Sequence, residues 1–431
     1  MIPLLGATGG HGDAVASVVL ALAVILAAAK LGGDLAARAG QPAVLGELVM
    51  GVVLGNVGLA GIPWLEPLRG DATIAMLAEL GVLILLFQVG LEGTVRDMLK
   101  VGLPALLVAV LGVVTPFALG WGAGALLLPA AGSYVHAFLG ATLTATSVGI
   151  TARVLQDLGR SRSPEARVIL GAAVIDDVLG LVILAVVAGT IQAADLGGAL
   201  SLGDIAVVFL QAAIFLVGAL ALGVAFSRKL FHLASRLRGR GVLLTTALVF
   251  CFVLAYLSSV MGLAPIVGAY AAGLILEDVH YRDFADRGEH PLEELIQPVA
   301  SVLVPVFFVL MGMRVTLTAF GQPGVLGLAA LITGAAILGK QACSLGAIGG
   351  TLDRLSIGIG MIPRGEVGLI FANIGLSLTI GGVPVVSEAI YSAIVIMVIV
   401  TTMATPPTLK WSLARGERRR ARRTEGGTAT R

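Results

Sequence analysis

Long apolar runs separated by short polar segments dominate the pattern of this chain of 431 residues. A run of about 20 apolar residues is long enough to cross the hydrocarbon core of a bilayer as an α-helix. The runs are continuous and do not alternate between apolar and polar positions, which excludes the strands of a membrane β-barrel. The pattern therefore predicts an all-α polytopic membrane protein with about thirteen transmembrane helices. They are expected near residues 14–32, 43–60, 72–91, 101–128, 136–157, 166–191, 204–226, 242–261, 264–277, 295–314, 322–349, 353–376 and 387–411.

Composition and charge agree with a membrane location and orient the helices. The chain is 57% hydrophobic and 13% charged, with a mean hydropathy of +1.00, a balance that excludes a soluble protein. Lysines and arginines gather in alternate loops and in the tail, so the positive-inside rule predicts an N-terminus outside the cell and a cytoplasmic C-terminus. On this basis residues 1–411 form the membrane domain and residues 412–431 a basic cytoplasmic tail. We expect the tail to contact anionic lipids rather than nucleic acid.

The two halves of the membrane domain resemble each other at a fixed offset of 222 residues. At this offset Gly46, Gly51, Gly90 and Gly112 align with Gly268, Gly273, Gly312 and Gly334. The pattern predicts a first repeat over about 14–191, a connector helix over about 204–226 and a second repeat over about 242–411. Because the offset equals seven predicted helices, an odd number, the second repeat enters the membrane upside down. Inverted repeats are typical of secondary transporters, whose binding site lies at the midplane.

Two adjacent carboxylates, Asp176 and Asp177, lie at the centre of the sixth predicted helix. A charged side chain at the bilayer centre costs roughly 2.5–3.5 kcal/mol on insertion scales, so such residues usually face a cavity and pair with one another. Neighbouring helix positions point about 100° apart, so these carboxylates cannot share a proton as a proteolytic dyad does. We expect one of them to pair with Lys340 of the eleventh helix. Such a pair can exchange protons near neutral pH, while the other carboxylate suits a small cation or a proton. A static salt bridge between helices is the alternative.

Two predicted helices contain residues that interrupt a helix, and they occupy corresponding places in the two repeats. The fifth contains Thr146, Ser147 and Gly149, and the twelfth contains Pro363 beside Arg364. Proline removes a backbone donor and breaks the helix, and a pair of discontinuous helices marks the binding site of many carriers. Arg364 and Glu366 could offset the partial charges of the half-helix ends. Hydrogen bonds from the hydroxyls to their own helix are the alternative for Thr146 and Ser147.

Two further acidic residues in the apolar runs, Glu47 and Glu79, have open roles: each could line a cavity or a dimer interface. The chain contains no phosphate-binding glycine loop, so ATP hydrolysis is not expected. Its histidines are not spaced as metal ligands. No cofactor is expected other than the ions that a carrier would transport.

Four segments in this order carry a resemblance to a known family. They are ATSVGITARVLQDLG (residues 145–159), GAAVIDDVLGL (171–181), ILGK (337–340) and GMIPRGEVGLI (360–370). Together they resemble bacterial sodium/proton antiporters of the second monovalent cation:proton antiporter family, over about residues 40–407. The resemblance implies an inverted-repeat fold with a core, or transport, domain that contains two crossed broken helices. It also implies a separate dimerisation domain and an elevator-like movement of the core.

The resemblance also assigns roles to individual residues. Asp177 matches the carboxylate that binds the metal ion, Na⁺, and the proton in turn, and Asp176 matches the neighbour that pairs with Lys340. Thr146 and Ser147 lie at the first broken helix, and 363–366 near the second. An aspartate pair is associated with electrogenic exchange of two protons for one cation. The potassium-efflux branch usually carries a cytoplasmic nucleotide-binding domain, so the tail of this chain favours sodium.

The sequence thus predicts a homodimeric antiporter of the inner membrane and not an enzyme. We expect it to exchange protons for a monovalent cation, Na⁺ or Li⁺ first. A potassium/proton antiporter is the nearest alternative. A sodium-coupled symporter of an organic anion, with Arg364 reading a carboxylate, is an alternative of a different class.

Overall fold

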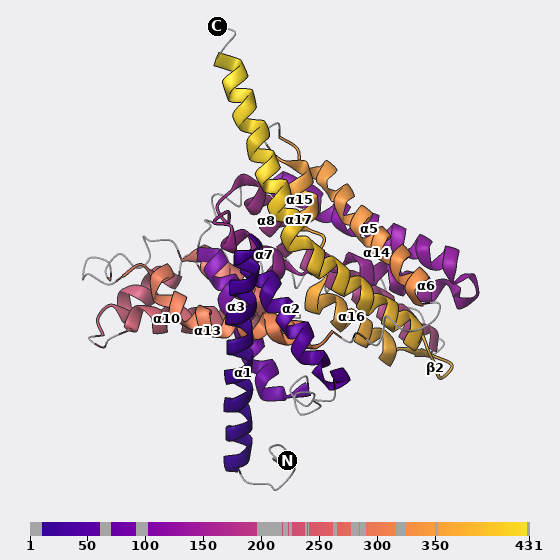
Figure 1. Ribbon diagram of the computed structural model, residues 1–431, viewed down its shortest axis with the longest axis horizontal. Helices are drawn as coiled ribbons and strands as arrows, with labels where there is room; N and C mark the ends of the chain where they lie inside the picture. The colour runs from indigo at the N-terminus through magenta and orange to yellow at the C-terminus, as the bar shows by residue number, and fades with distance from the viewer. Residues whose placement is uncertain are drawn as a thin grey trace.

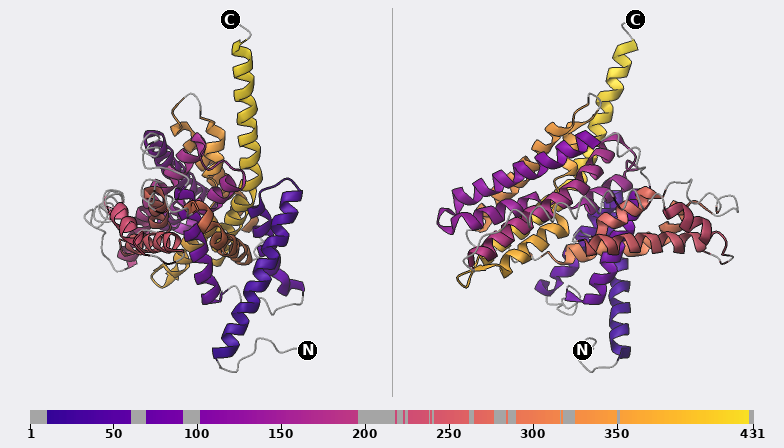
Figure 2. Two further views of the ribbon diagram at one scale, coloured as in Figure 1. Left: turned by 90° about the vertical axis from the view of Figure 1, so that its left-hand side faces the viewer. Right: turned by 180° about the vertical axis from the view of Figure 1, so that it is seen from behind.

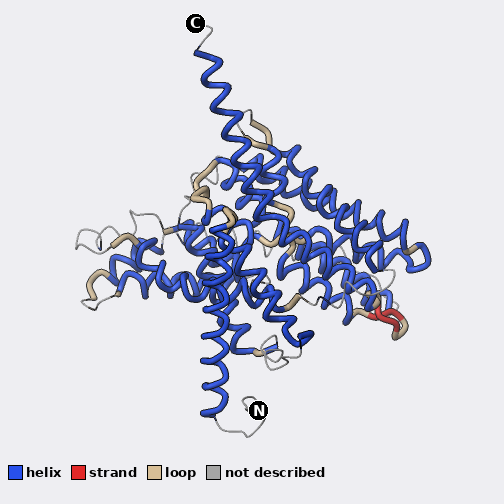
Figure 3. Tube along the Cα trace, in the orientation of Figure 1, coloured by secondary structure: helices blue, strands red, loops and turns tan. Residues whose placement is uncertain are grey.

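A computed structural model shows a chain that is almost entirely helical (Figure 3). It describes residues 11–60, 70–91, 102–195, 226–237, 241–261, 265–276, 290–315, 325–349 and 352–428, and single residues at 218, 223, 239, 284 and 317. A helix satisfies all its backbone polar groups internally, which a segment surrounded by lipid must do. The apolar runs are therefore helices, and the one small sheet in the described part of the chain lies in a turn.

The helices of the first half follow the predicted runs closely. They are α1 (His11–Arg38), α2 (Ala43–Asn56), α3 (Ala72–Leu91), α5 (Gly102–Leu127), α6 (Gly132–Thr144), α7 (Val148–Asp157) and α8 (Pro164–Asp195). Short 3₁₀ turns, η1 (Val57–Ala60) and η3 (Pro129–Ala131), follow α2 and α5. The predicted connector over 204–226 lies almost wholly outside the described residues.

The second half contains α10 (Val242–Val260), α11 (Pro265–Ile275), α13 (Leu292–Met313), α14 (Val325–Ala342), α15 (Arg354–Gly360), α16 (Gly365–Ser377) and α17 (Glu388–Thr428). The 3₁₀ turn η6 (Cys343–Gly346) follows α14, and a hairpin of β1 (Thr379–Ile380) and β2 (Val383–Pro384) follows α16. In the described residues nine helices are long and apolar enough to cross a membrane, and three shorter helices are also apolar. The chain is therefore an integral membrane protein; the count of thirteen stays a prediction.

Both predicted helix breaks are present. The first separates α6 from α7 at residues 145–147, and the second separates α15 from α16 at residues 361–364. Pro363 cannot donate a backbone hydrogen bond, and Gly365 takes a positive φ of 47° at the start of α16, a backbone conformation that favours glycine. Local chemistry thus ends each helix where the sequence predicts.

The helices form two groups, which lie side by side in Figures 1 and 2. One group, here the panel, packs α1, α2, α3, α10, α11 and α13 together; the other, the bundle, packs α5–α8 with α14–α17. Helices α2 and α3 of the panel contact α7 of the bundle, and α2 also contacts α17. The N-terminal end of α1 and the C-terminal end of α17 lie at opposite ends of the molecule, and α17 extends beyond the other helices (Figure 2).

Close contacts at glycines in the panel recur at the offset of 222 residues. Gly46 lies against the backbone of Gly32, and Gly268 lies against the backbone of Leu254. Likewise Gly51 of α2 touches Gly312 of α13, while Gly273 of α11 touches Gly90 of α3. Each contact in the first list position maps onto its counterpart by the same offset. Small residues let helices in a membrane approach closely, so the aligned glycines of the sequence mark equivalent helix crossings.

These crossings predict the effect of adding one methyl group. In Gly51→Ala the new Cβ would lie 2.8 Å from the Cα of Gly312, and overpacking of this kind costs about 1–3 kcal/mol. We expect a lower melting temperature of the purified protein, and a similar loss for the equivalent Gly273→Ala. Gly334→Ala in α14 is the control, because no heavy atom lies within 4 Å of its new Cβ. Equal melting temperatures for all three variants would contradict close packing at the crossings.

Candidate functional site

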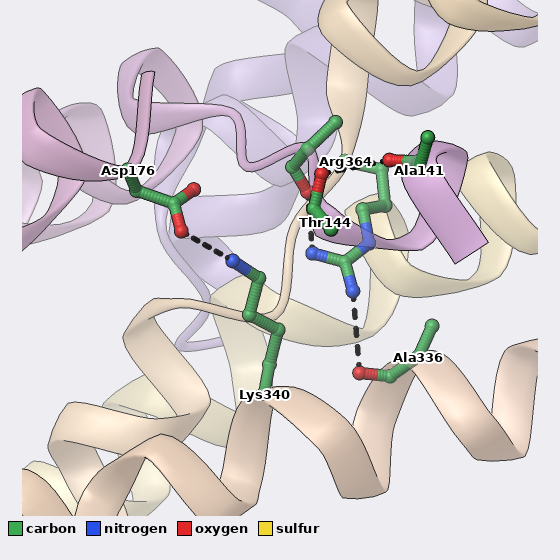
Figure 4. Close-up of polar contacts among 7 residues, drawn as sticks. Ala141, Thr144, Asp176, Ala336, Lys340 and Arg364 are labelled. Carbon is green, nitrogen blue, oxygen red and sulfur yellow. Dashed lines mark hydrogen bonds and ion pairs between the residues drawn. The ribbon is translucent and has the colours of Figure 1, made fainter. Parts of the chain in front are cut away.

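A buried ion pair joins α8 to α14 inside the bundle. The Lys340 Nζ lies 2.8 Å from Asp176 Oδ1, and the two side chains are 0% and 1% exposed (Figure 4). Gly112 of α5 faces both, and a Cβ there would lie 3.5 Å from the Lys340 Nζ. Taking either charge out of water alone is costly, so each depends on the other. The structure therefore makes the pair that the sequence predicts, with Lys340 in the last turn of α14 rather than deep within it.

The two aspartates differ in exposure as neighbouring positions of a helix must. Asp176 is buried, whereas Asp177 is half-buried. The lysine takes one oxygen of Asp176, so the adjacent carboxylate lies on another side of α8. This arrangement matches one paired carboxylate beside a second that is partly accessible.

The two helix breaks meet each other through backbone hydrogen bonds. The N–H of Ser147 donates to the carbonyl oxygen of Pro363 at 2.7 Å. The Thr151 hydroxyl donates to the carbonyl of Gly360 at 2.6 Å, and the Gly365 N–H donates to the Thr402 hydroxyl at 3.1 Å. Backbone groups freed by the breaks are thus satisfied by the opposite break and by α17, which irregular backbone at membrane depth requires.

Arg364 occupies the crossing of the breaks and is fully buried. Its guanidinium donates to the carbonyl of Ala145, just past the end of α6, and to the carbonyl of Ala336 in α14 at 3.3 Å (Figure 4). A cation is stabilised at a helix C-terminus, where the carbonyls carry partial negative charge. Arg364 therefore offsets the end of α6, as predicted. The side chain of Glu366 lies outside what the structure describes.

Some buried polar atoms near the crossing have no hydrogen-bond partner within the described residues. They include Thr146 Oγ1, Asp176 Oδ2 and Arg364 Nε. A buried polar atom without a partner costs about 1–3 kcal/mol, so the two oxygens mark a place where a small cation or water finds ligands. Ser147 is fully buried at the same break. Gly149 follows it in α7, and a Cβ there would lie 3.3 Å from Val82 of α3. The predicted residues at the first break thus share one region of the bundle.

The two acidic residues whose roles the sequence left open have different environments. Glu79 is exposed on α3. Glu47 is buried in α2, with its Oε1 3.5 Å from the guanidinium of Arg153 in α7. Sequence reasoning treated Arg153 only as one of the cations beside a loop. Its spacing of four residues from Asp157, to which it is ion-paired at 3.0 Å, was the available signal.

Comparison with known proteins follows from this geometry. Residues 17–415 match the family model described as "Sodium/hydrogen exchanger, transmembrane". The high-affinity Na(+)/H(+) antiporter NhaS3 of Synechocystis sp. is 38% identical over 430 residues, covering 92% of this chain and 89% of that protein. The Na(+)/H(+)-K(+) antiporter GerN of Bacillus cereus is 35% identical over 91% of this chain and 95% of its own. A solved structure of the sodium proton antiporter MjNhaP1 from Methanocaldococcus jannaschii has a similar fold, with a TM-score of 0.66, 18% identity, and coverage of 95% of this chain and 98% of that one.

The buried pair predicts a marked loss of stability when one partner is removed. Lys340→Ala leaves the Asp176 carboxylate buried without its cation, and breaking a buried pair costs about 3–5 kcal/mol. We expect a lower melting temperature for Lys340→Ala and a smaller loss for the double variant Lys340→Gln/Asp176→Asn, which buries no charge. Thermal denaturation of the purified proteins measures both. A double variant less stable than Lys340→Ala would show that the charge pairing is not what stabilises this site.

Proposed function

This chain belongs to the sodium/hydrogen exchanger family of integral membrane cation/proton antiporters, and we propose that it exchanges protons for Na⁺ or Li⁺ at the crossing of its two helix breaks. The observation that carries this proposal is the buried Asp176–Lys340 pair beside Asp177 and both breaks. Partnerless oxygens at the same place add support. Hard oxygen ligands suit a small alkali cation.

Asp177 is the carboxylate for which the cation and the proton compete. Thr146 and Ser147, at the first break, supply further oxygens, and Gly149 and Pro363 shape the backbone around them. With Asp176 neutralised by Lys340, an ionised Asp177 leaves the site with one negative charge, which either a proton or Na⁺ cancels. A neutral core crosses the membrane at lower cost than a charged one. Competition for one carboxylate therefore couples the two fluxes.

We assign the movement to the bundle, which carries the site, and the fixed part to the panel. The recurrent glycine crossings at an offset of 222 residues support two repeats of one unit. An inverted arrangement of these repeats would expose the crossing to each side in turn by an elevator-like displacement. This assignment makes the contacts of α7 with α2 and α3 the surface along which the bundle moves.

The panel also serves as the dimerisation domain of a homodimer in the inner membrane. An exposed carboxylate on an apolar helix, such as Glu79 on α3, is costly against lipid, and a second copy could cover it. We place the N-terminus outside and the C-terminus in the cytoplasm, which the opposite positions of the ends of α1 and α17 support. The arginines at the end of α17 would then lie near anionic lipids.

Potassium is the second candidate cation. GerN, at 35% identity, is named a Na(+)/H(+)-K(+) antiporter, so a relative of this chain combines both ions. A sodium-coupled symporter with Arg364 as the anion reader has less support. The guanidinium of Arg364 is fully buried and already donates to two backbone carbonyls, so an anion would have to displace them.

The site assignment predicts loss of exchange in Asp177→Asn, because an amide neither ionises nor takes up a proton. Proton flux is measured in proteoliposomes with an imposed pH gradient as Na⁺, Li⁺ or K⁺ is added in turn. Na⁺ or Li⁺ should collapse the gradient with the wild type and with the control Asp34→Asn, an exposed position on α1. Exchange by Asp177→Asn at the wild-type rate would refute the assignment, and a response to K⁺ alone would move the proposal to potassium.

Exchange of two protons for one cation predicts a net inward movement of positive charge when protons enter. Asp177 carries one proton and the Asp176–Lys340 pair carries the other. We expect Na⁺-driven exchange in proteoliposomes to generate a membrane potential that a voltage-sensitive dye reports, and an interior-negative potential to accelerate proton entry. A rate independent of the potential would indicate a one-to-one exchange.

A further inference from the structure

Helix α7 links the candidate site to the boundary between the bundle and the panel. It begins at Val148, directly after Thr146 and Ser147, and ends at Asp157. Ten helical residues span about 15 Å, so one end lies at the first break and the other lies well away from it. A displacement of either end is therefore transmitted to the other.

The far end of α7 supplies the cap that α2 lacks. The residue before α2 is Pro42, and no side chain of its own caps the amino end of this helix. Instead the Val44 N–H donates to Asp157 Oδ2 at 3.2 Å. A carboxylate at a helix N-terminus is favourable because the first N–H groups have no partner within the helix and carry partial positive charge. The bundle thus caps a helix of the panel.

An ion-pair cluster strengthens the same contact. Arg153 of α7 lies 3.5 Å from Glu47 of α2 and 3.0 Å from Asp157, and the three side chains are 18%, 6% and 13% exposed. Glu47 Oε2 has no hydrogen-bond partner among the described residues. Two carboxylates share one guanidinium here, and Lys30 of α1 adds only a weaker attraction to Glu47.

A polar cavity of about 360 Å³ lies next to this cluster. It is lined by Gln156 and Gly159 at the end of α7, by Gln88 of α3, and by Glu293 and Gln297 of α13. On that side α7 faces open space rather than packed side chains of the panel. The polar contacts with α2 are consequently well placed to hold this end of the helix.

We propose that Glu47, Arg153 and Asp157 form an ion-pair latch that holds α7 against α2 and that opens in each exchange cycle. Glu47 and Arg153 are then positioning residues: they touch no transported ion but set how fast the bundle leaves the position seen here. This inference rests on the proposed antiport by a bundle that moves against the panel.

The latch predicts that Glu47→Gln speeds exchange. The variant keeps the shape of the side chain and leaves the Arg153–Asp157 pair intact, while it removes the charge that crosses between the groups. We expect kcat for Na⁺/H⁺ exchange to rise about three- to tenfold, as for loss of a partly buried ion pair, with an unchanged KM for Na⁺. Asp34→Asn is the matched control, because its ion pair with Arg38 lies exposed within α1 and should leave both constants unaltered. An unchanged or lower kcat in Glu47→Gln would overturn the latch.

A cross-link tests the movement itself. In Glu47→Cys/Arg153→Cys a short, reducible bifunctional thiol reagent should stop exchange, and a reductant should restore it. The two native cysteines are fully buried, and wild type treated with the reagent controls for them. Full exchange by the cross-linked protein would show that α2 and α7 do not separate. Loss of the proposed function is distinguishable, since the untreated wild type would then fail to exchange at all.

Discussion

The buried pair of Asp176 and Lys340 is the constraint on which the rest of the bundle depends. Neither charge could be held in a low-dielectric interior alone, so α8 and α14 must meet at this point, and Gly112 leaves room for them on α5. Arg364 adds a third buried charge within the same region, and it is satisfied by carbonyls rather than by a carboxylate. The bundle therefore packs around its charges as much as around its apolar side chains.

The helix breaks follow from the same requirement. A polar site inside a membrane protein needs free backbone groups, and these are tolerated only where protein covers them. Here the two breaks cover each other, since Ser147 bonds to the carbonyl of Pro363 and Thr151 bonds to that of Gly360. Each break would be unstable without its counterpart. The crossing is thus one structural unit made from segments more than 200 residues apart.

Much of this arrangement could be predicted from the sequence, because membrane helices are written locally as apolar runs and breaks as proline, glycine and hydroxyl residues. The Asp176–Lys340 pair was predictable since few partners exist for a charge at that depth. Other features depend on tertiary contacts. The proline pair Pro406–Pro407 does not end α17, which continues to Thr428 rather than stopping near residue 411. Glu47 could not be assigned, because its partner Arg153 is remote in the sequence and reads locally as a loop cation.

The position of Arg153 gives the short helix α7 two different ends. At one end irregular backbone and hydroxyls adjoin the aspartates; at the other, charges join the helix to the panel. A ligand changes a conformational equilibrium only through a difference in its interaction with the two states. A rigid helix that ends in both places supplies such a difference, because a shift of the break on ion binding also strains the contact with α2. The chemistry of the site and the mechanics of the boundary are consequently joined by ten residues.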